Sequence, residues 1–155
     1  VMVAKSGDTL LADSAIDALK SILFARATLL TPNLPEAAKL VGEGSTQVQA
    51  KALLDLGVGA VLMKGGHADG ETCTDHLVSR TGTQDFSAPR VNTRNTHGTG
   101  CSYSSAIAAG LAQGMALNDA VAQAHAWLHL AILHADELYV GQGQGPVHHF
   151  HALWT

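Results

Sequence analysis

Short apolar segments alternate with amphipathic segments along the chain, and this alternation constrains the fold more than any other feature. Residues 60–63 are a continuous apolar run, Ala-Val-Leu-Met, typical of a strand buried in a parallel sheet. A shorter apolar strand is predicted at 28–30, and helical periodicity predicts helices at 13–24, 35–41 and 46–56. Alternating strands and helices favour an α/β fold with an open, mostly parallel sheet.

The rest of the chain adds an exposed strand element and two further helices. Residues 72–78 and 85–87 predict strands of an antiparallel element, and residues 102–113 predict a helix of small side chains. A last long helix, with Asn118 as its cap, is predicted to run towards Tyr139. The opening residues, 1–4, resemble the end of a strand that belongs to something longer.

The composition is typical of a globular protein and argues against some kinds of partner. The 155 residues are enough for one domain with a core, and 46% of them are hydrophobic while 14% are charged. The net charge of −4 and the lack of a Lys/Arg run argue against nucleic acid as a partner. No apolar run approaches the roughly 20 residues of a membrane span. Two cysteines form no disulfide framework, so a cytoplasmic location is expected.

Polar motifs follow the predicted strands at residues 31–36, 64–67 and 97–101. Ligands of open α/β sheets bind at the carboxyl ends of the strands. The coincidence of the three segments therefore predicts one ligand site.

The strongest motif is Gly98-Thr99-Gly100-Cys101, at the start of a predicted helix. Glycines let the backbone wrap, and the unpaired N–H groups of a helix start bind anions such as a phosphoryl group in transfer. The alternative is a glycine turn that leads into a close-packed helix. A helix start also favours the thiolate of Cys101, which could take a proton from a substrate hydroxyl or contact the substrate; the alternative is a small buried residue.

The other two motifs offer a cation and possible magnesium ligands. Lys64 follows a buried strand and is placed to reach phosphate oxygens, with a solvated lysine as the alternative. Asn33 and Glu36 could hold the waters of Mg²⁺, with simple helix capping as the alternative. The spacing of His148, His149 and His151 fits no tetrahedral zinc pattern, which favours a packed C-terminal segment.

Together these motifs resemble one family. In order and spacing, the chain is similar to hydroxymethylpyrimidine/phosphomethylpyrimidine kinases of the ribokinase-like superfamily. Most ribokinase relatives have an aspartate base after the glycine turn, whereas this subgroup has a cysteine, as at Cys101. The resemblance covers essentially the whole chain and lies in residues 4–8, 31–37, 63–67, 95–101 and 145–151.

The resemblance implies a three-layer α/β/α fold, here lacking the N-terminal strands, with residues 1–155 as the C-terminal, ATP-binding part of a single domain. It implies ATP-dependent phosphorylation of 4-amino-5-hydroxymethyl-2-methylpyrimidine and its monophosphate in thiamine biosynthesis, by a homodimer. Residues 98–101 would form the anion hole, with Cys101 in the position of the base. The residues expected to bind ATP or Mg²⁺ are Lys64, Gly66, Asn33 and Glu36, the last two acting on the metal through water.

The chain departs from this family in its length. Family members continue much further at the N-terminus, where they hold the first strands and most pyrimidine contacts, and we expect the native enzyme to contain that part. Two alternatives stay open. One is a pyridoxine/pyridoxal kinase, since some relatives with this cysteine accept that ring. The other is a non-catalytic fragment that binds nucleotide.

Overall fold

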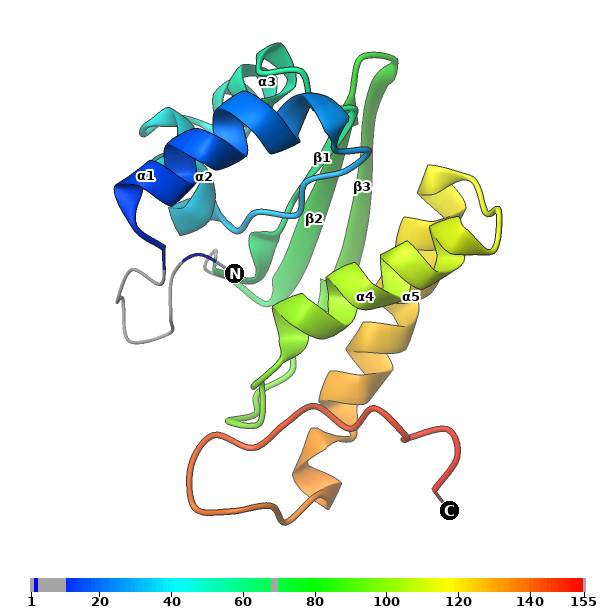
Figure 1. The fold of residues 1–155 in the computed structure, drawn as a ribbon. Coiled ribbons are helices and arrows are strands. Elements are labelled where there is room, and N and C mark those ends of the chain that lie inside the picture. Colours follow the sequence, from blue (N-terminus) through cyan, green and yellow to red (C-terminus); the bar gives the residue numbers. More distant parts are fainter. Residues whose placement is uncertain (1, 3–10, 68–69, 155) are drawn as a thin grey trace. The chain divides into compact units, whose positions relative to one another are not determined.

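The computed structural model describes residues 2, 11–67 and 70–154 (Figure 1). The chain divides into two compact units, Val1–Ser87 and Ala88–Thr155, and each is described by itself. The strand end predicted at residues 1–4 lies outside the described residues, apart from Met2.

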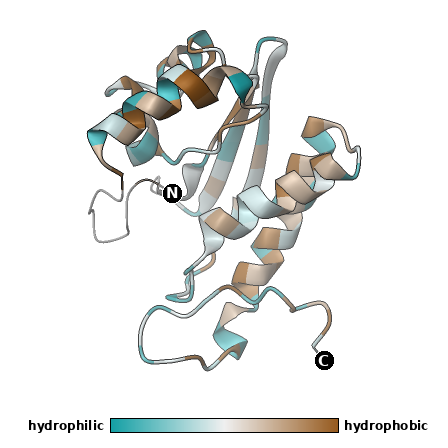
Figure 2. Cartoon of the chain, in the orientation of Figure 1, coloured by the Kyte–Doolittle hydropathy of each residue, from teal (hydrophilic) through white to brown (hydrophobic). Residues whose placement is uncertain are grey.

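Three helical segments of the first unit match the predicted ones. Helix α1 (Asp13–Ala18) continues through π-helical and 3₁₀ turns to Arg26, and α2 (Leu34–Val41) and α3 (Thr46–Asp55) follow. Hydrophobic and hydrophilic residues are mixed along these helices, as amphipathic helices require (Figure 2). Helix α2 ends at Gly42, whose φ of 89° favours glycine.

The described sheet has the order β1-β2-β3, with β1 (Ala60–Met63), β2 (Thr72–Ser79) and β3 (Gly82–Pro89). Strand β1 pairs antiparallel with β2, so the expectation of a mostly parallel sheet is wrong for this part of the chain. The cause lies in the short connections, because residues 64–71 are too few for the crossover of a dozen or more residues that parallel pairing needs.

Among the described residues of the first unit, parallel pairing occurs as two isolated bridges beside β1. Leu30 pairs with Val61 and Asn33 pairs with Lys64, so the segment before α2 runs alongside β1. The buried strand predicted at 28–30 is therefore reduced to a bridge, and Thr28 is exposed. This pairing matters for function because it places Asn33 beside Lys64.

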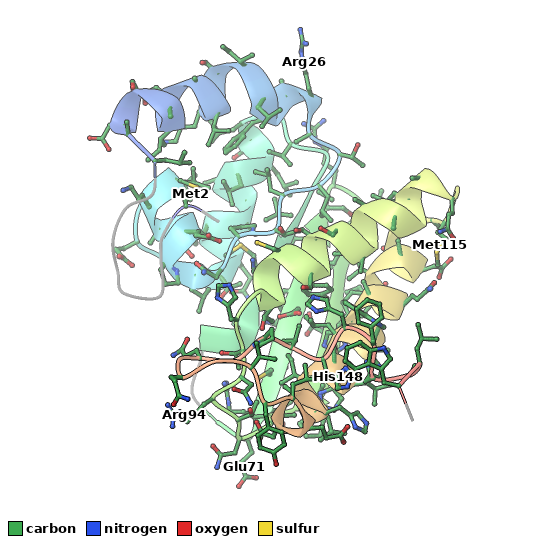
Figure 3. All side chains as sticks on the ribbon, turned by 60° about the horizontal axis from the view of Figure 1, so that its bottom comes forward. Met2, Arg26, Glu71, Arg94, Met115 and His148 are labelled. Atoms are coloured by element: carbon green, nitrogen blue, oxygen red, sulfur yellow. The ribbon has the colours of Figure 1, made fainter. Side chains whose placement is uncertain are left out.

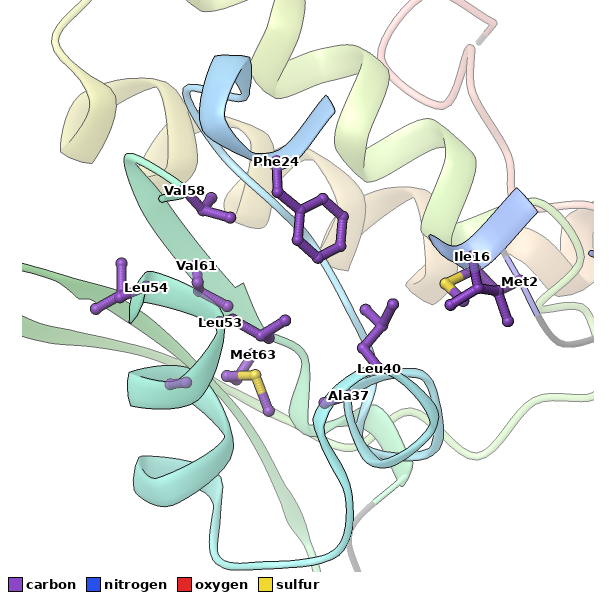
Figure 4. Packing of buried hydrophobic residues seen from close by; sticks show 11 residues of the cluster. Met2, Ile16, Phe24, Ala37, Leu40, Leu53, Leu54, Val58, Val61 and Met63 are labelled. Atoms are coloured by element: carbon purple, nitrogen blue, oxygen red, sulfur yellow. The ribbon is translucent and has the colours of Figure 1, made fainter. Parts of the chain in front are cut away.

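The core of the first unit lies between β1 and the helices (Figure 4). All four residues of β1 are buried, which confirms the strand predicted from the apolar run. Each fully buried large aliphatic or aromatic side chain contributes about 1.5–3 kcal/mol, so this core fixes the strand whose end carries Lys64. The packed side chains include Ile16, Phe24, Leu40, Leu53, Val58, Val61 and Met63.

The second unit contains two helices that pack on each other, α4 (Thr99–Ala112) and α5 (Leu117–Leu133). Small residues allow their approach, since a Cβ added at Gly110 would lie 3.1 Å from the Cβ of Ala120. The predicted cap at Asn118 is wrong, because α5 begins one residue earlier and its N-cap is Ala116. No helix among the described residues is long and apolar enough to cross a membrane.

Candidate functional site

Lys64 follows β1 and lies beside the start of α2. Its Nζ donates a hydrogen bond to the carbonyl oxygen of Thr31 at 2.6 Å and lies 3.9 Å from Oε2 of Glu36. The side chain of Lys64 is only 17% exposed. The alternative of a solvated lysine is therefore wrong, and the residue is a partly buried cation held in a defined place.

Asn33 and Glu36 form a capping box at the start of α2. Oδ1 of Asn33 accepts a hydrogen bond from the N–H of Glu36 at 2.8 Å, and Oε2 of Glu36 accepts one from the N–H of Asn33 at 3.0 Å. The capping role is confirmed, since both groups satisfy donors that the helix start leaves free.

Glu36 is a buried carboxylate, and its environment keeps it charged. Burial by itself raises the pKa of Glu36. Hydrogen bonds from the N–H groups of Asn33 and Met2, together with the positive charge of Lys64, lower this pKa by more than burial raises it. The net pKa lies below the ordinary value of 4.5. The carboxylate is therefore ionised at neutral pH.

A water-mediated contact with Mg²⁺ fits this donor set. Mg²⁺ prefers carboxylate and carbonyl oxygens and keeps several waters. Each of the side-chain oxygens of Asn33 and Glu36 accepts a hydrogen bond from one backbone N–H, and a carboxylate or amide oxygen can accept more than one hydrogen bond. Among the described residues no group of three His, Cys, Asp or Glu side chains could hold the ion directly. A contact through water would let Asn33 and Glu36 keep these hydrogen bonds.

Replacing Glu36 with glutamine is expected to lower the free energy of unfolding at pH 7 by about 1.5–3 kcal/mol, because charge-assisted hydrogen bonds to a buried group are lost. The pKa of Glu36 is lower in the folded state than in the unfolded state. The ionised side chain therefore stabilises the fold fully above the unfolded-state pKa, and this stabilisation is lost as the pH falls through the folded-state pKa. Urea unfolding from pH 7 to pH 3 measures both effects. The difference between the proteins should shrink towards acid, and a constant difference would count against this account.

The turn after β1 is held by a residue of β2. The N–H of Gly65 donates to Oδ1 of Asp75 at 2.8 Å, and Asp75 is 8% exposed. A Cβ added at Gly65 would lie 1.9 Å from the carbonyl oxygen of Thr74, whereas one at Gly66 would meet nothing within 4 Å. The predicted site residue was Gly66, but the steric requirement falls on Gly65. The sequence analysis also missed Asp75. The one sequence feature that could have drawn attention to it is an acidic residue inside a predicted strand.

A pocket of about 200 Å³ opens beside this turn. Its lining joins Lys64 and the turn after β1 with residues of β2. The pocket is lined by Leu34, Thr46, Met63, Lys64, Gly65, Thr72, Thr74 and His76.

The glycine turn of the second unit opens α4. Gly98 has φ 82° and ψ −2°, the left-handed conformation that favours glycine, and α4 begins at Thr99, earlier than the predicted residue 102. Within the described part of the chain, the N–H groups of Gly100 and Cys101 have no hydrogen-bond acceptor. Two adjacent backbone donors at the start of a 14-residue helix can bind an anion.

Cys101 lies in the first turn of α4 and is exposed. The alternative of a small buried residue is therefore wrong. Its thiol is accessible and lies in the same turn as the free N–H groups of Gly100 and Cys101.

The C-terminal segment packs within the second unit. The N–H of His148 donates to the carbonyl oxygen of Ala131 at 2.8 Å, and His148 is 4% exposed. Figure 3 labels His148 among the side chains of the protein. Its ring meets the ring of Trp154 edge-on, with centroids 5.3 Å apart, and Nε2 of His149 lies 2.7 Å from Oγ of Ser102 in α4. The packed segment predicted from the histidine spacing is confirmed.

The predicted site residues thus fall into two sets. The first unit brings Asn33, Glu36 and Lys64 together and leaves Gly66 exposed on the adjoining turn. The second unit joins residues 98–101 into one turn and the start of α4. Asn95, which lies in the quoted motif but had no predicted role, binds the C-terminal segment through its side chain.

Known proteins resemble this chain over nearly its whole length. Residues 1–148 match the phosphomethylpyrimidine kinase family. The hydroxymethylpyrimidine/phosphomethylpyrimidine kinase of Salmonella typhimurium is 52% identical over 160 residues, which cover 99% of this chain and 60% of that enzyme. The chain therefore spans about 60% of the length of such relatives.

Solved structures share the fold. Pyridoxal kinase from Staphylococcus aureus in complex with AMP-PCP superposes with a TM-score of 0.85 at 29% identity, over 96% of this chain and 55% of that one. Phosphomethylpyrimidine kinase from Clostridium difficile superposes with a TM-score of 0.71 at 34% identity, over 85% of this chain and 55% of that one. The expected ribokinase-like α/β fold is confirmed, and the chain belongs to the phosphomethylpyrimidine kinase family.

Proposed function

We propose that this chain is the ATP-binding part of a kinase that phosphorylates 4-amino-5-hydroxymethyl-2-methylpyrimidine and then its monophosphate, in thiamine biosynthesis. The observation that carries the proposal is the start of α4, where Gly98 turns the chain and the N–H groups of Gly100 and Cys101 stay free, in a member of this family. Free backbone donors stabilise the charge of a phosphoryl group in transfer without reorganising.

Each site residue has a role in this proposal. Lys64 attracts the phosphate oxygens of ATP as a point charge, and Gly66, on the adjoining turn, lies at the nucleotide. Sγ of Cys101 takes the proton of the substrate hydroxyl as that oxygen attacks the γ-phosphorus of ATP, and the bond from this phosphorus to the bridging oxygen breaks and releases ADP. Asn33 and Glu36 would contact Mg²⁺ through water, and the bound ion would supply neutralisation of phosphate charge. The ATP analogue in the similar pyridoxal kinase supports ATP as the phosphoryl donor.

Phosphoryl transfer by the purified chain tests the proposal. The chain is incubated with Mg-ATP and the hydroxymethylpyrimidine, and product masses are measured. Mono- and diphosphorylated pyrimidine are the expected products. If the chain binds Mg-ATP but transfers nothing, even when it is extended with the N-terminal segment of a longer relative, it is a non-catalytic nucleotide-binding protein and the proposal fails.

A pyridoxine/pyridoxal kinase is the second candidate, favoured by the similarity to solved pyridoxal kinases. The higher identity to the pyrimidine kinase, 52% against 29%, supports the pyrimidine as substrate. Turnover of the two alcohols at equal concentration separates the candidates. The homodimer stays a prediction from the resemblance, and the cytoplasmic location stays a prediction from the two cysteines.

Replacing Lys64 with alanine is expected to weaken ATP binding by about 10- to 100-fold, because a charged contact with phosphate contributes about 1.5–3 kcal/mol. Titration calorimetry with Mg-ATP measures the change. Lys51→Ala is the matched control, since Lys51 forms an exposed pair with Asp55 2.9 Å away, which is worth little. Equal ATP affinity of the Lys64 variant and the control would exclude Lys64 from the phosphate site.

A further inference from the structure

Asn95 lies three residues before Gly98 and binds two other segments of the second unit. Its Oδ1 accepts a hydrogen bond from the N–H of Gly145 at 2.9 Å. Its Nδ2 donates to Oδ1 of Asp136 at 2.9 Å and to the carbonyl oxygen of Ala135 at 3.3 Å. One side-chain amide thus joins the approach to the glycine turn, the end of the last helical segment and the C-terminal segment.

The contact with Gly145 is tight and depends on glycine. Gly145 is buried, and a Cβ at this position would lie 2.4 Å from Oδ1 of Asn95. Any side chain at residue 145 would therefore force the amide away. The close approach places the backbone of Gly145 where it can pair with the strand-like segment before the turn.

That pairing reaches the residue next to Gly98. The N–H of His97 donates to the carbonyl oxygen of Gly145 at 3.0 Å, and the carbonyl oxygen of His97 accepts from the N–H of Val147 at 3.3 Å. These bonds hold His97 on both sides. Because Gly98 follows directly, they also fix the direction in which the chain enters α4.

We propose that Asn95 is a positioning residue for phosphoryl transfer. It acts by holding residues 145–147 against His97, which sets the orientation of the free N–H groups of Gly100 and Cys101. This inference rests on the proposed function. An amide suits the position because it accepts from Gly145 and donates to Asp136 at once. Aspartate would keep the first contact but lose the second and place like charges side by side.

The proposal is tested in the full chain by changing the amide of Asn95 and then swapping it with the carboxylate of Asp136. In Asn95→Asp, kcat is expected to fall about 10- to 100-fold with the KM values for ATP and pyrimidine nearly unchanged, since small misplacement of catalytic donors has costs of this size. The double variant Asn95→Asp/Asp136→Asn swaps amide and carboxylate and should recover part of the lost kcat, because the contact between residues 95 and 136 returns while the hydrogen bond to the carbonyl oxygen of Ala135 does not. Glu137→Gln is the control, because this neighbouring acid pairs with His134 instead.

Amide hydrogen exchange of the same variants measures directly whether residues 145–147 stay bound to Asn95 and His97. The N–H groups of His97, Gly145 and Val147 should exchange faster in Asn95→Asp and recover in the double variant. An unchanged kcat in Asn95→Asp overturns the proposal, whether or not exchange accelerates. A lowered kcat that the double variant fails to recover also overturns it.

If the wild type transfers nothing even when it is extended with the N-terminal segment of a longer relative, the proposed function fails, and this inference is tested by a second measurement. AMP-PCP is then titrated while the amide resonances of Gly100 and Cys101 are followed. Shifts in the wild type and the double variant, but not in Asn95→Asp, support the positioning role. Equal behaviour of all three proteins overturns it.

Discussion

Gly65→Ala is expected to lower the free energy of unfolding by about 3 kcal/mol, the upper range for overpacking in a fixed environment. The added Cβ would lie 1.9 Å from the carbonyl oxygen of Thr74, and backbone of β2 cannot rotate away as a flexible side chain can. Either the turn after β1 or β2 must shift, which also breaks the bond from the N–H of Gly65 to Asp75. The melting temperature should fall by roughly 6–12 °C.

Gly66→Ala is the matched control for this substitution. A Cβ at Gly66 meets nothing within 4 Å, and its φ is not positive, so its stability should stay within about 0.5 kcal/mol of the wild type. Thermal unfolding followed by circular dichroism compares the two variants. If both alanines destabilise the chain equally, the close approach of Thr74 is not the cause.

Cys101→Ala is expected to lower kcat at least about 100-fold, the usual minimum contribution of a general base, with little change in ATP affinity. The thiol is exposed in the first turn of α4, beside N–H groups that would hold the phosphoryl oxygens. Removing it should therefore leave ATP binding intact and slow the proton transfer. Initial rates with saturating Mg-ATP, together with calorimetric ATP titration, separate these effects.

The second cysteine supplies the control for this variant. Cys73 is half-buried in β2, outside the predicted site residues, so Cys73→Ala should keep the wild-type rate. Cys101→Ser adds a further test, because a hydroxyl of similar size is a far weaker acid than a thiol. Full activity in either Cys101 variant would mean that the backbone N–H groups and substrate positioning carry the reaction without a thiolate base.

Local sequence patterns were sufficient for the helices and for the places of the motifs. The apolar run at 60–63 predicts the buried strand β1, and helical periodicity predicts α2, because burial on one face leaves its period in the sequence. The capping box of Asn33 and Glu36 is equally local, since its partners lie three residues apart. The glycine turn before α4 was also correctly placed, although the helix begins at Thr99.

Pairing between distant segments was decided by the tertiary structure. The periodicity of a strand does not predict which other strand it pairs with. The antiparallel pairing of β1 with β2 follows from the short connection between them. Choosing Gly65 rather than Gly66 as the constrained glycine required knowledge of where the backbone of Thr74 lies. The partners of Lys64 and Asn95 lie 28 to 50 positions away in the sequence and leave no periodic signal.

The sequence by itself therefore determined the family, the helices and the residues that carry charge or free backbone donors, because these follow from residue type and local spacing. The tertiary structure decided how those groups are held. Glu36 and Thr31 fix Lys64, Asp75 fixes the turn after β1, and Asn95 secures the approach to α4. The physical reason is that a hydrogen bond to a distant residue depends on the packing of both segments, which no local pattern encodes.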